Sequence, residues 1–128
     1  MSFRRNSMDK KEINIYLKQL VEGTQSNING ILIIQKNGQI INSVLPDQID
    51  AQKISLFGTI LVGSGERACD ELNKGKLKQV MVGGDFGKII FISNGDDEFL
   101  GALVPFETNY DDVLIELEII AALINTLN

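Results

Sequence analysis

Residues 50–73 carry a pattern that predicts one long helix with apolar side chains on two sides. At about 100° per residue, one stripe gathers the residues suited to lie on a sheet: Ile54, Gly58, Leu61, Val62, Gly65, Cys69 and Leu72. Leu56 and Ile60 point roughly the opposite way, and Phe57 lies on the flank between. An ordinary surface helix has one apolar stripe and an opposite polar face. We therefore expect this helix to pack on its own sheet and also on another chain.

The composition argues against several classes of function. The chain has 128 residues, which fits one domain, and its net charge of −5 argues against nucleic-acid binding. Histidine, the usual general base and metal ligand, is absent. The one cysteine, Cys69, allows no internal disulfide and is interpreted as a small buried residue. Neither a secretory signal nor a membrane-spanning run is found, so we expect a cytoplasmic protein without membrane insertion.

The pattern along the chain predicts three helices and five strands in the order α-ββ-α-βββ-α. The strands are expected at residues 30–36, 39–45, 77–83, 88–94 and 98–106. The first helix is expected at residues 9–22, and the last helix begins at Asn109 or Asp111. Asn37-Gly38, between the first two strands, favours a type I′ hairpin turn. Residues 1–8 are expected to form a flexible arm and residues 9–128 a single domain.

Two of the predicted strands are apolar on both faces. Residues 31–34 and 89–92 are large and apolar without alternation, which is typical of strands buried on both sides. The short turns within 30–45 and 77–106 favour antiparallel hairpins. Three helices and two faces to cover predict an α/β fold, a three-layer α/β/α sandwich. In it, the first and last helices share one face of the sheet and the long helix covers the other.

Four short motifs are candidates for functional sites. Residues 85–87 (DFG) match a kinase tripeptide without the other kinase motifs, which indicates a hairpin turn. Residues 63–65 (GSG) lie in mid-helix without a phosphate-loop lysine, which indicates close approach to a sheet or another backbone. Residues 96–98 (DDE) lack calcium-loop spacing and indicate a solvated turn. The lysines within 74–78 either protect a sheet edge or dock a partner. We expect no catalytic residue, no metal site and no cofactor.

The outer stripe of the long helix has a register that suits pairing with a second copy. The candidate contacts are Lys53, Leu56, Phe57, Ile60, Gly63, Ser64, Arg67 and Glu71. If two such helices lie antiparallel and cross near residue 62, Lys53 approaches Glu71 and Phe57 approaches Arg67. Small residues at positions 63 and 64 let the two backbones come near. The register therefore indicates a homodimer, although several nearby crossings also suit these residues.

The succession of elements, together with INGILIIQKNGQIINSVL at residues 28–45 and the link LNKGKL at residues 72–77, resembles the roadblock / dynein light chain family. The likeness covers about residues 10–126. It implies a five-stranded antiparallel sheet between the long helix and the two terminal helices. It also implies dimerisation through the long helix, residues 50–73, and the strand at residues 77–83. On the strand, this dimer surface falls on Leu77, Val80 and Val82.

The resemblance also implies a function. Members of this family act as non-catalytic partners of Ras-like GTPases or as subunits of motors and scaffolds. We therefore expect a homodimeric adaptor that binds and regulates a small Ras-like GTPase, with a GTPase-activating or scaffolding role. A small-ligand sensor and a structural subunit of a motor or scaffold remain the alternatives. The sequence leaves open a heterodimer with a related chain.

Overall fold

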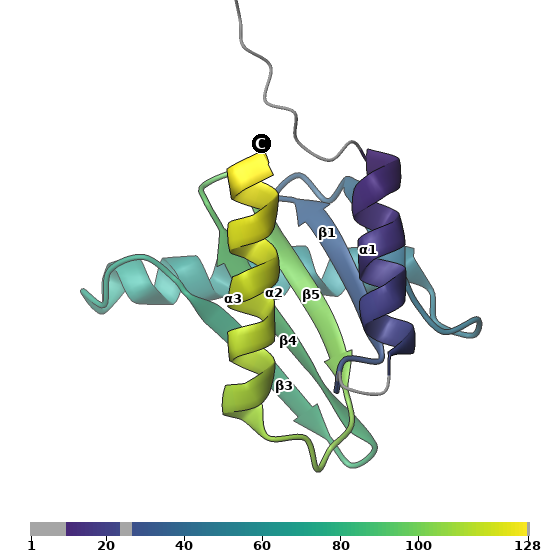
Figure 1. Cartoon of the computed structure of the whole chain (residues 1–128). Helices are drawn as coiled ribbons and strands as arrows, with labels where there is room; N and C mark the ends of the chain where they lie inside the picture. The colour runs from purple at the N-terminus through teal and green to yellow at the C-terminus, as the bar shows by residue number, and fades with distance from the viewer. Residues whose placement is uncertain (1–9, 24–26, 128) are drawn as a thin grey trace, which may run out of the picture.

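The computed structural model describes residues 10–23 and 27–127, and contains three helices and five strands in the predicted order (Figure 1). They are α1 (Lys10–Glu22), β1 (Gly30–Gln35), β2 (Ile40–Val44), α2 (Ala51–Glu71), β3 (Gln79–Gly84), β4 (Gly87–Asn94), β5 (Glu98–Val104) and α3 (Tyr110–Leu127). The arm predicted at residues 1–8 lies outside the described residues. Of the two predicted starts of the last helix, the first is correct, because the Asn109 side chain accepts a hydrogen bond from the Asp112 amide.

The five strands form one antiparallel sheet in the order β2-β1-β5-β4-β3. The hairpins β1–β2 and β3–β4 are local, whereas β1 pairs with β5 across the length of the chain, from Gly30 opposite Leu103 to Gln35 opposite Glu98. The three inner strands β1, β5 and β4 therefore have neighbours on both sides. Strands β2 and β3 are the two edges of the sheet.

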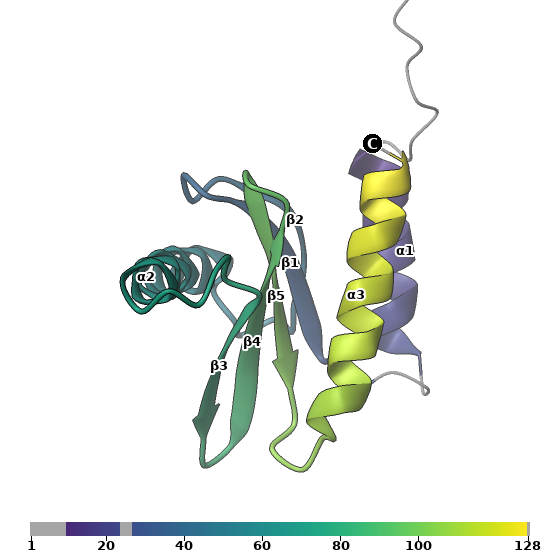
Figure 2. The ribbon, with the colours of Figure 1, turned by 90° about the vertical axis from the view of Figure 1, so that its left-hand side faces the viewer.

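The sheet divides the core into two clusters, as the two-faced strands predicted. On one face, Ile31 and Ile33 share a cluster with buried side chains of α1 and α3. On the other face, Leu32 and Ile34 share a cluster with Ile54 and Val62 of α2. Figure 2 shows the three layers, with α1 and α3 side by side and α2 alone on the opposite side. The predicted α/β/α sandwich is confirmed.

Helix α2 lies close to the sheet because a glycine faces two phenylalanine rings. Phe91 of β4 and Phe99 of β5 meet edge to face, with ring centroids 5.8 Å apart. A Cβ atom at Gly58 would lie only 2.7 Å from the Phe91 ring and 3.0 Å from the Phe99 ring.

The helix begins after Asp50, whose side chain accepts a hydrogen bond from the Gln52 amide.

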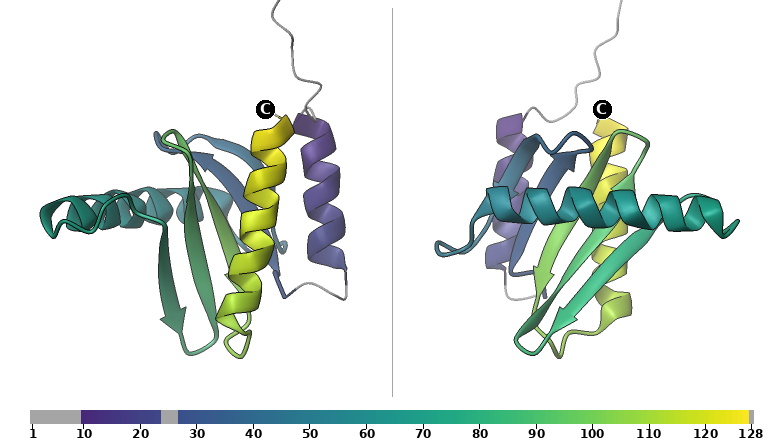
Figure 3. Two further views of the ribbon diagram at one scale, coloured as in Figure 1. Left: turned by 60° about the vertical axis from the view of Figure 1, so that its left-hand side comes forward. Right: turned by 180° about the vertical axis from the view of Figure 1, so that it is seen from behind.

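The end of α2 differs from the expectation for its inner stripe. Leu72 is 66% exposed, although its angular position places it with the core residues. Cys69 is half-buried. The reason is geometric: the C-terminal end of α2 projects beyond the sheet (Figure 3), and both residues belong to that end of the helix. Helical periodicity defines which side of a helix faces inward but carries no information on where the sheet ends.

The β1–β2 turn also differs from the expectation. A type I′ turn needs a positive φ at both central residues, but at Asn37-Gly38 only Gly38 has one, φ 93°. The Gly38 amide donates to the Gln35 carbonyl, and the Gln35 amide donates to the Gln39 carbonyl. The Asn37 side chain accepts a hydrogen bond from the Gln39 amide at 2.9 Å. This longer loop, with one left-handed glycine, replaces the predicted two-residue turn.

The contact between Gly58 and the two rings generates a stability prediction. Gly58→Ala is expected to lower the free energy of unfolding by about 1–3 kcal/mol because the added methyl group overpacks the core. The matched control is Gly63→Ala, since a Cβ atom there meets nothing within 4 Å. For a lone chain, its stability is expected to stay the same or rise by up to about 1 kcal/mol. Urea unfolding measures both variants, and equal stabilities would contradict this packing.

Candidate interaction surface

The outer side of α2 exposes large apolar side chains. Leu56, Phe57 and Ile60 are 58%, 58% and 53% exposed, respectively. The other predicted contact residues on the helix are exposed as well: Lys53, Gly63, Ser64, Arg67 and Glu71. On the opposite side of the helix, Ile54, Gly58 and Val62 are buried against the sheet. The helix therefore has the two apolar sides that its sequence predicted, and one of them is uncovered in the single chain.

Edge strand β3 continues this exposed surface. It pairs with β4 on one side only, so its other side presents unpaired backbone groups. Val82 is 40% exposed, whereas Val80 and the preceding Leu77 are half-buried under α2. Met81, which sequence reasoning did not single out, is 45% exposed. Its place in the alternating strand was visible in the sequence, but whether a helix covers its face was not.

The two glycines of the predicted close-approach motif face different surroundings. A Cβ atom at Gly65 would lie 3.1 Å from side-chain carbons of Leu77 and Val80, so this glycine lets α2 approach the sheet edge. A Cβ atom at Gly63 would meet nothing within 4 Å. The expectation of close approach to the sheet is confirmed for Gly65. At Gly63 the helix surface is open.

Charged residues on the projecting end of α2 pair within the helix. The Arg67 Nε atom lies 2.7 Å from a carboxylate oxygen of Glu71, one turn further along the helix. Both side chains are mostly exposed, and an exposed pair of this kind contributes at most about 1 kcal/mol. Either residue can therefore exchange its partner for one on another chain at little cost in free energy.

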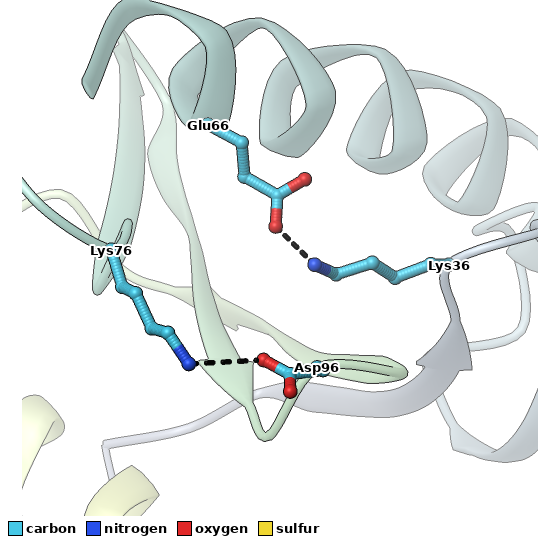
Figure 4. Close-up of polar contacts among 4 residues, drawn as sticks. All are labelled: Lys36, Glu66, Lys76 and Asp96. Atoms are coloured by element: carbon cyan, nitrogen blue, oxygen red, sulfur yellow. Dashed lines mark hydrogen bonds and ion pairs between the residues drawn. The ribbon is translucent and has the colours of Figure 1, made fainter. Parts of the chain in front are cut away.

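Two ion pairs connect α2 and its following link to the turns of the sheet (Figure 4). Lys36, in the β1–β2 turn, pairs with Glu66 of α2. Lys76, in the link after α2, lies 3.4 Å from Asp96 in the β4–β5 turn, and both of these side chains are exposed. The two pairs line one pocket of about 340 Å³. The Lys36–Glu66 pair connects α2 to the β1–β2 turn, and Lys76 of the predicted basic cluster forms its ion pair within its own chain.

The acidic side chains of the turn at residues 96–98 have different partners and do not form a common binding site. Asp96 pairs with Lys76, whereas Glu98 accepts a hydrogen bond from Asn94 at 2.6 Å. Burial raises the pKa of Glu98 above its usual value, and the hydrogen bond from Asn94 opposes that rise. Within residues 10–23 and 27–127, no group of three or more acidic, cysteine or histidine side chains is arranged to hold a metal ion.

The DFG sequence forms the tip of the β3–β4 hairpin, as predicted. Gly84 pairs with Gly87, which leaves Asp85 and Phe86 as the two turn residues. The Phe86 side chain is fully exposed, and sequence reasoning missed it because it treated the three residues only as a motif. None of the helices that the structure describes has the length and apolar character needed to cross a membrane.

Solved structures with the same arrangement of elements include two of MglB and one of a Roadblock/LC7 domain. Myxococcus xanthus MglB superposes with a TM-score of 0.80 at 16% identity, covering 94% of this chain and 89% of that one. A Roadblock/LC7 domain from Streptomyces avermitilis gives 0.77 at 17% identity, covering 93% and 95%. A structure described as "MglB with tetrameric arrangement" gives 0.75 at 10% identity, covering 92% and 89%. At these identities the likeness shows a shared fold.

Sequence comparison gives the family. An uncharacterized protein of Methanocaldococcus jannaschii, MJ0310, is 32% identical over 69 residues, which are 54% of this chain and 60% of that relative. The match thus spans less than two thirds of the relative's length. The family model described as the Roadblock/LC7 domain matches residues 17–104, from α1 to the end of β5. The chain therefore belongs to the Roadblock/LC7 domain family.

Proposed function

We propose that this chain is a non-catalytic adaptor that forms a homodimer through α2 and β3 and binds and regulates a small Ras-like GTPase. The observation that carries the proposal is the uncovered apolar side of α2, formed by Leu56, Phe57 and Ile60, next to the unpaired edge of β3. Two features of one surface, a helix side and a strand edge, are left without a partner. A second copy supplies a partner for both.

The physical case for self-association starts from burial of the apolar side chains. Complete burial of a leucine, isoleucine or phenylalanine side chain contributes roughly 1.5–3 kcal/mol. In an antiparallel pair of α2 helices, Leu56, Phe57 and Ile60 are buried twice by symmetry. The open surface at Gly63 lets the helices approach closely. Pairing of the two β3 edges would continue the sheet into the second copy and satisfy its unpaired backbone groups.

The shape of α2 supports the same assembly. Its C-terminal end projects beyond β3, and Leu72 on that end is 66% exposed (Figure 3). A helix that overhangs its own sheet can cover the sheet of a neighbour placed edge to edge with it. The solved structure described as "MglB with tetrameric arrangement", which has the same fold, further supports association of this chain into an oligomer.

The family resemblance supports the GTPase as partner. The Roadblock/LC7 domain matches residues 17–104, and the resemblance to this family implies a non-catalytic partner of a Ras-like GTPase or a subunit of a motor or scaffold. Arg67 is the one arginine on the proposed dimer surface, where dimerisation would bury it, so we assign it no role as a catalytic arginine finger. The adaptor would act by presenting a shaped surface across two α2 helices.

A charge exchange tests the dimer and its register. Lys53→Glu is expected to weaken dimers at least about tenfold, because the introduced carboxylate would face Glu71 of the second copy twice by symmetry. Adding Glu71→Lys to the same chain is expected to restore the dimer. Lys18→Glu on α1, far from this surface, is the control with the same charge change. Light scattering gives the mass of each variant.

Two results of that measurement would count against the assembly. A chain that remains monomeric at micromolar concentration would overturn the dimer. A dimer that Lys53→Glu weakens but Glu71→Lys does not restore would overturn the proposed crossing near residue 62 and leave the surface itself in place. Ile60→Glu separates these cases, because a buried charge in the middle of the surface disrupts every nearby crossing.

Capture experiments test the partner. Small Ras-like GTPases of the source organism are loaded either with GDP or with a non-hydrolysable GTP analogue. The bead-bound chain is expected to retain one of them in only one of these two nucleotide states. The Ile60→Glu variant is expected not to retain the GTPase, because the proposed GTPase-binding surface forms only in the dimer. Hydrolysis rates with and without the adaptor then separate an activating role from a scaffolding role. Equal background binding of every such GTPase in both states would contradict the proposal.

A further inference from the structure

Helix α3 has a second apolar face that points away from the sheet. Its buried side consists of Val113, Leu117, Ile120 and Ile124. On the outer side, Ile115 and Ile119 are 56% and 57% exposed, and Ala122 follows at the same angular position one turn later. We call these three residues the α3 stripe. Figure 2 shows α3 in the layer opposite α2, with none of the drawn helices or strands outside it.

Carboxylates border the α3 stripe on both sides. At about 100° per residue, Asp111 and Glu118 lie along one border, and Asp112 and Glu116 lie along the other. No lysine or arginine follows Lys88 in the chain, so the helix carries no compensating positive charge of its own. An apolar stripe bordered by carboxylates favours partners that combine apolar and basic side chains.

A hollow beside the α3 stripe gives the surface some depth. It has a volume of about 450 Å³ and lies between α3 and the start of β3, with Leu114, Glu118, Ala121 and Ala122 on the α3 side. Lys76 and Lys78 line its opposite side. A docked segment would therefore place its apolar residues over the stripe and the hollow. Its basic residues would lie over the carboxylates of α3, away from the two lysines.

We infer that the α3 stripe docks a basic amphipathic helix of a partner protein. Recognition of this kind uses apolar residues at positions i, i+3 or i+4 and i+7 of the bound helix, which matches the spacing of Ile115, Ile119 and Ala122. A second α3 helix is a poor occupant, because pairing two such helices would place carboxylates against carboxylates. The outer side of α1 offers a single large exposed apolar residue, Ile15. The site lies on the face opposite α2, so it does not depend on the proposed dimer.

A synthetic peptide provides a defined probe. The probe is a helical peptide with leucines at i, i+3, i+4 and i+7 and lysines at the remaining positions. It is expected to bind the full chain saturably in fluorescence anisotropy, and more weakly as salt is raised. Ile115→Ser with Ile119→Ser is expected to weaken binding at least about tenfold. The matched control, Leu56→Ser with Ile60→Ser on α2, removes two equally exposed side chains and is expected to leave peptide binding unchanged.

Charge variants and control peptides complete the test. Asp112→Lys with Glu116→Lys is expected to weaken binding several-fold, and a peptide with glutamates in place of lysines is expected not to bind. Circular dichroism checks that each variant is folded. Undiminished binding to the α3 serine variant, or equal binding of the acidic peptide, would overturn the inference. A lower mass of the α3 serine variant in light scattering would also overturn it, because that result would identify a second copy as the occupant.

Discussion

The structure depends on a sheet whose inner strands are apolar on both faces. β1, β5 and β4 send alternate side chains into two separate clusters, so neither face can be left in water. The terminal helices α1 and α3 together cover one face. The other face is covered by α2 alone, which can approach closely because Gly58 leaves room for the rings of Phe91 and Phe99. The three-layer order of the domain follows from this one requirement.

The same requirement leaves α2 and β3 incomplete. One helix crossing a five-stranded sheet must cover it from side to side, and α2 continues past the edge at β3 (Figure 3). Its outer side is apolar as well, at Leu56, Phe57 and Ile60. The helix therefore contributes to the core of its own chain and offers a surface to another. The inner side of α2 stabilises the fold, and its outer side is the surface proposed for association.

Much of this architecture and of the candidate surface could be predicted from local sequence signals. The Asp50 cap, the two-faced apolar strands and the hairpin tip at residues 85–87 each have a local physical cause. Helical periodicity likewise separates the two sides of α2. Exposure of Leu72 could not be predicted, because it depends on where a distant strand ends. The predicted type I′ turn at Asn37-Gly38 was wrong, because the dipeptide indicates that a turn is present without fixing the length of the loop. Ile115 and Ile119 were missed, and Met81 was not singled out within its strand, because alternation and helical spacing show that two faces exist without showing which one is covered.

The position of β3 also sets the order in which the sheet can open. Strand β5 has β1 and β4 on its two sides, so its amide hydrogens are released only when the long-range pairing is lost. Strand β3 has hydrogen-bonded strand contacts on one side alone, and it ends in two glycines, Gly83 and Gly84. It can detach from β4 while the rest of the sheet stays intact. Amide exchange in a lone chain should therefore begin at the edge strands and reach β5 last, and pairing of β3 with a second copy would slow exchange along that edge.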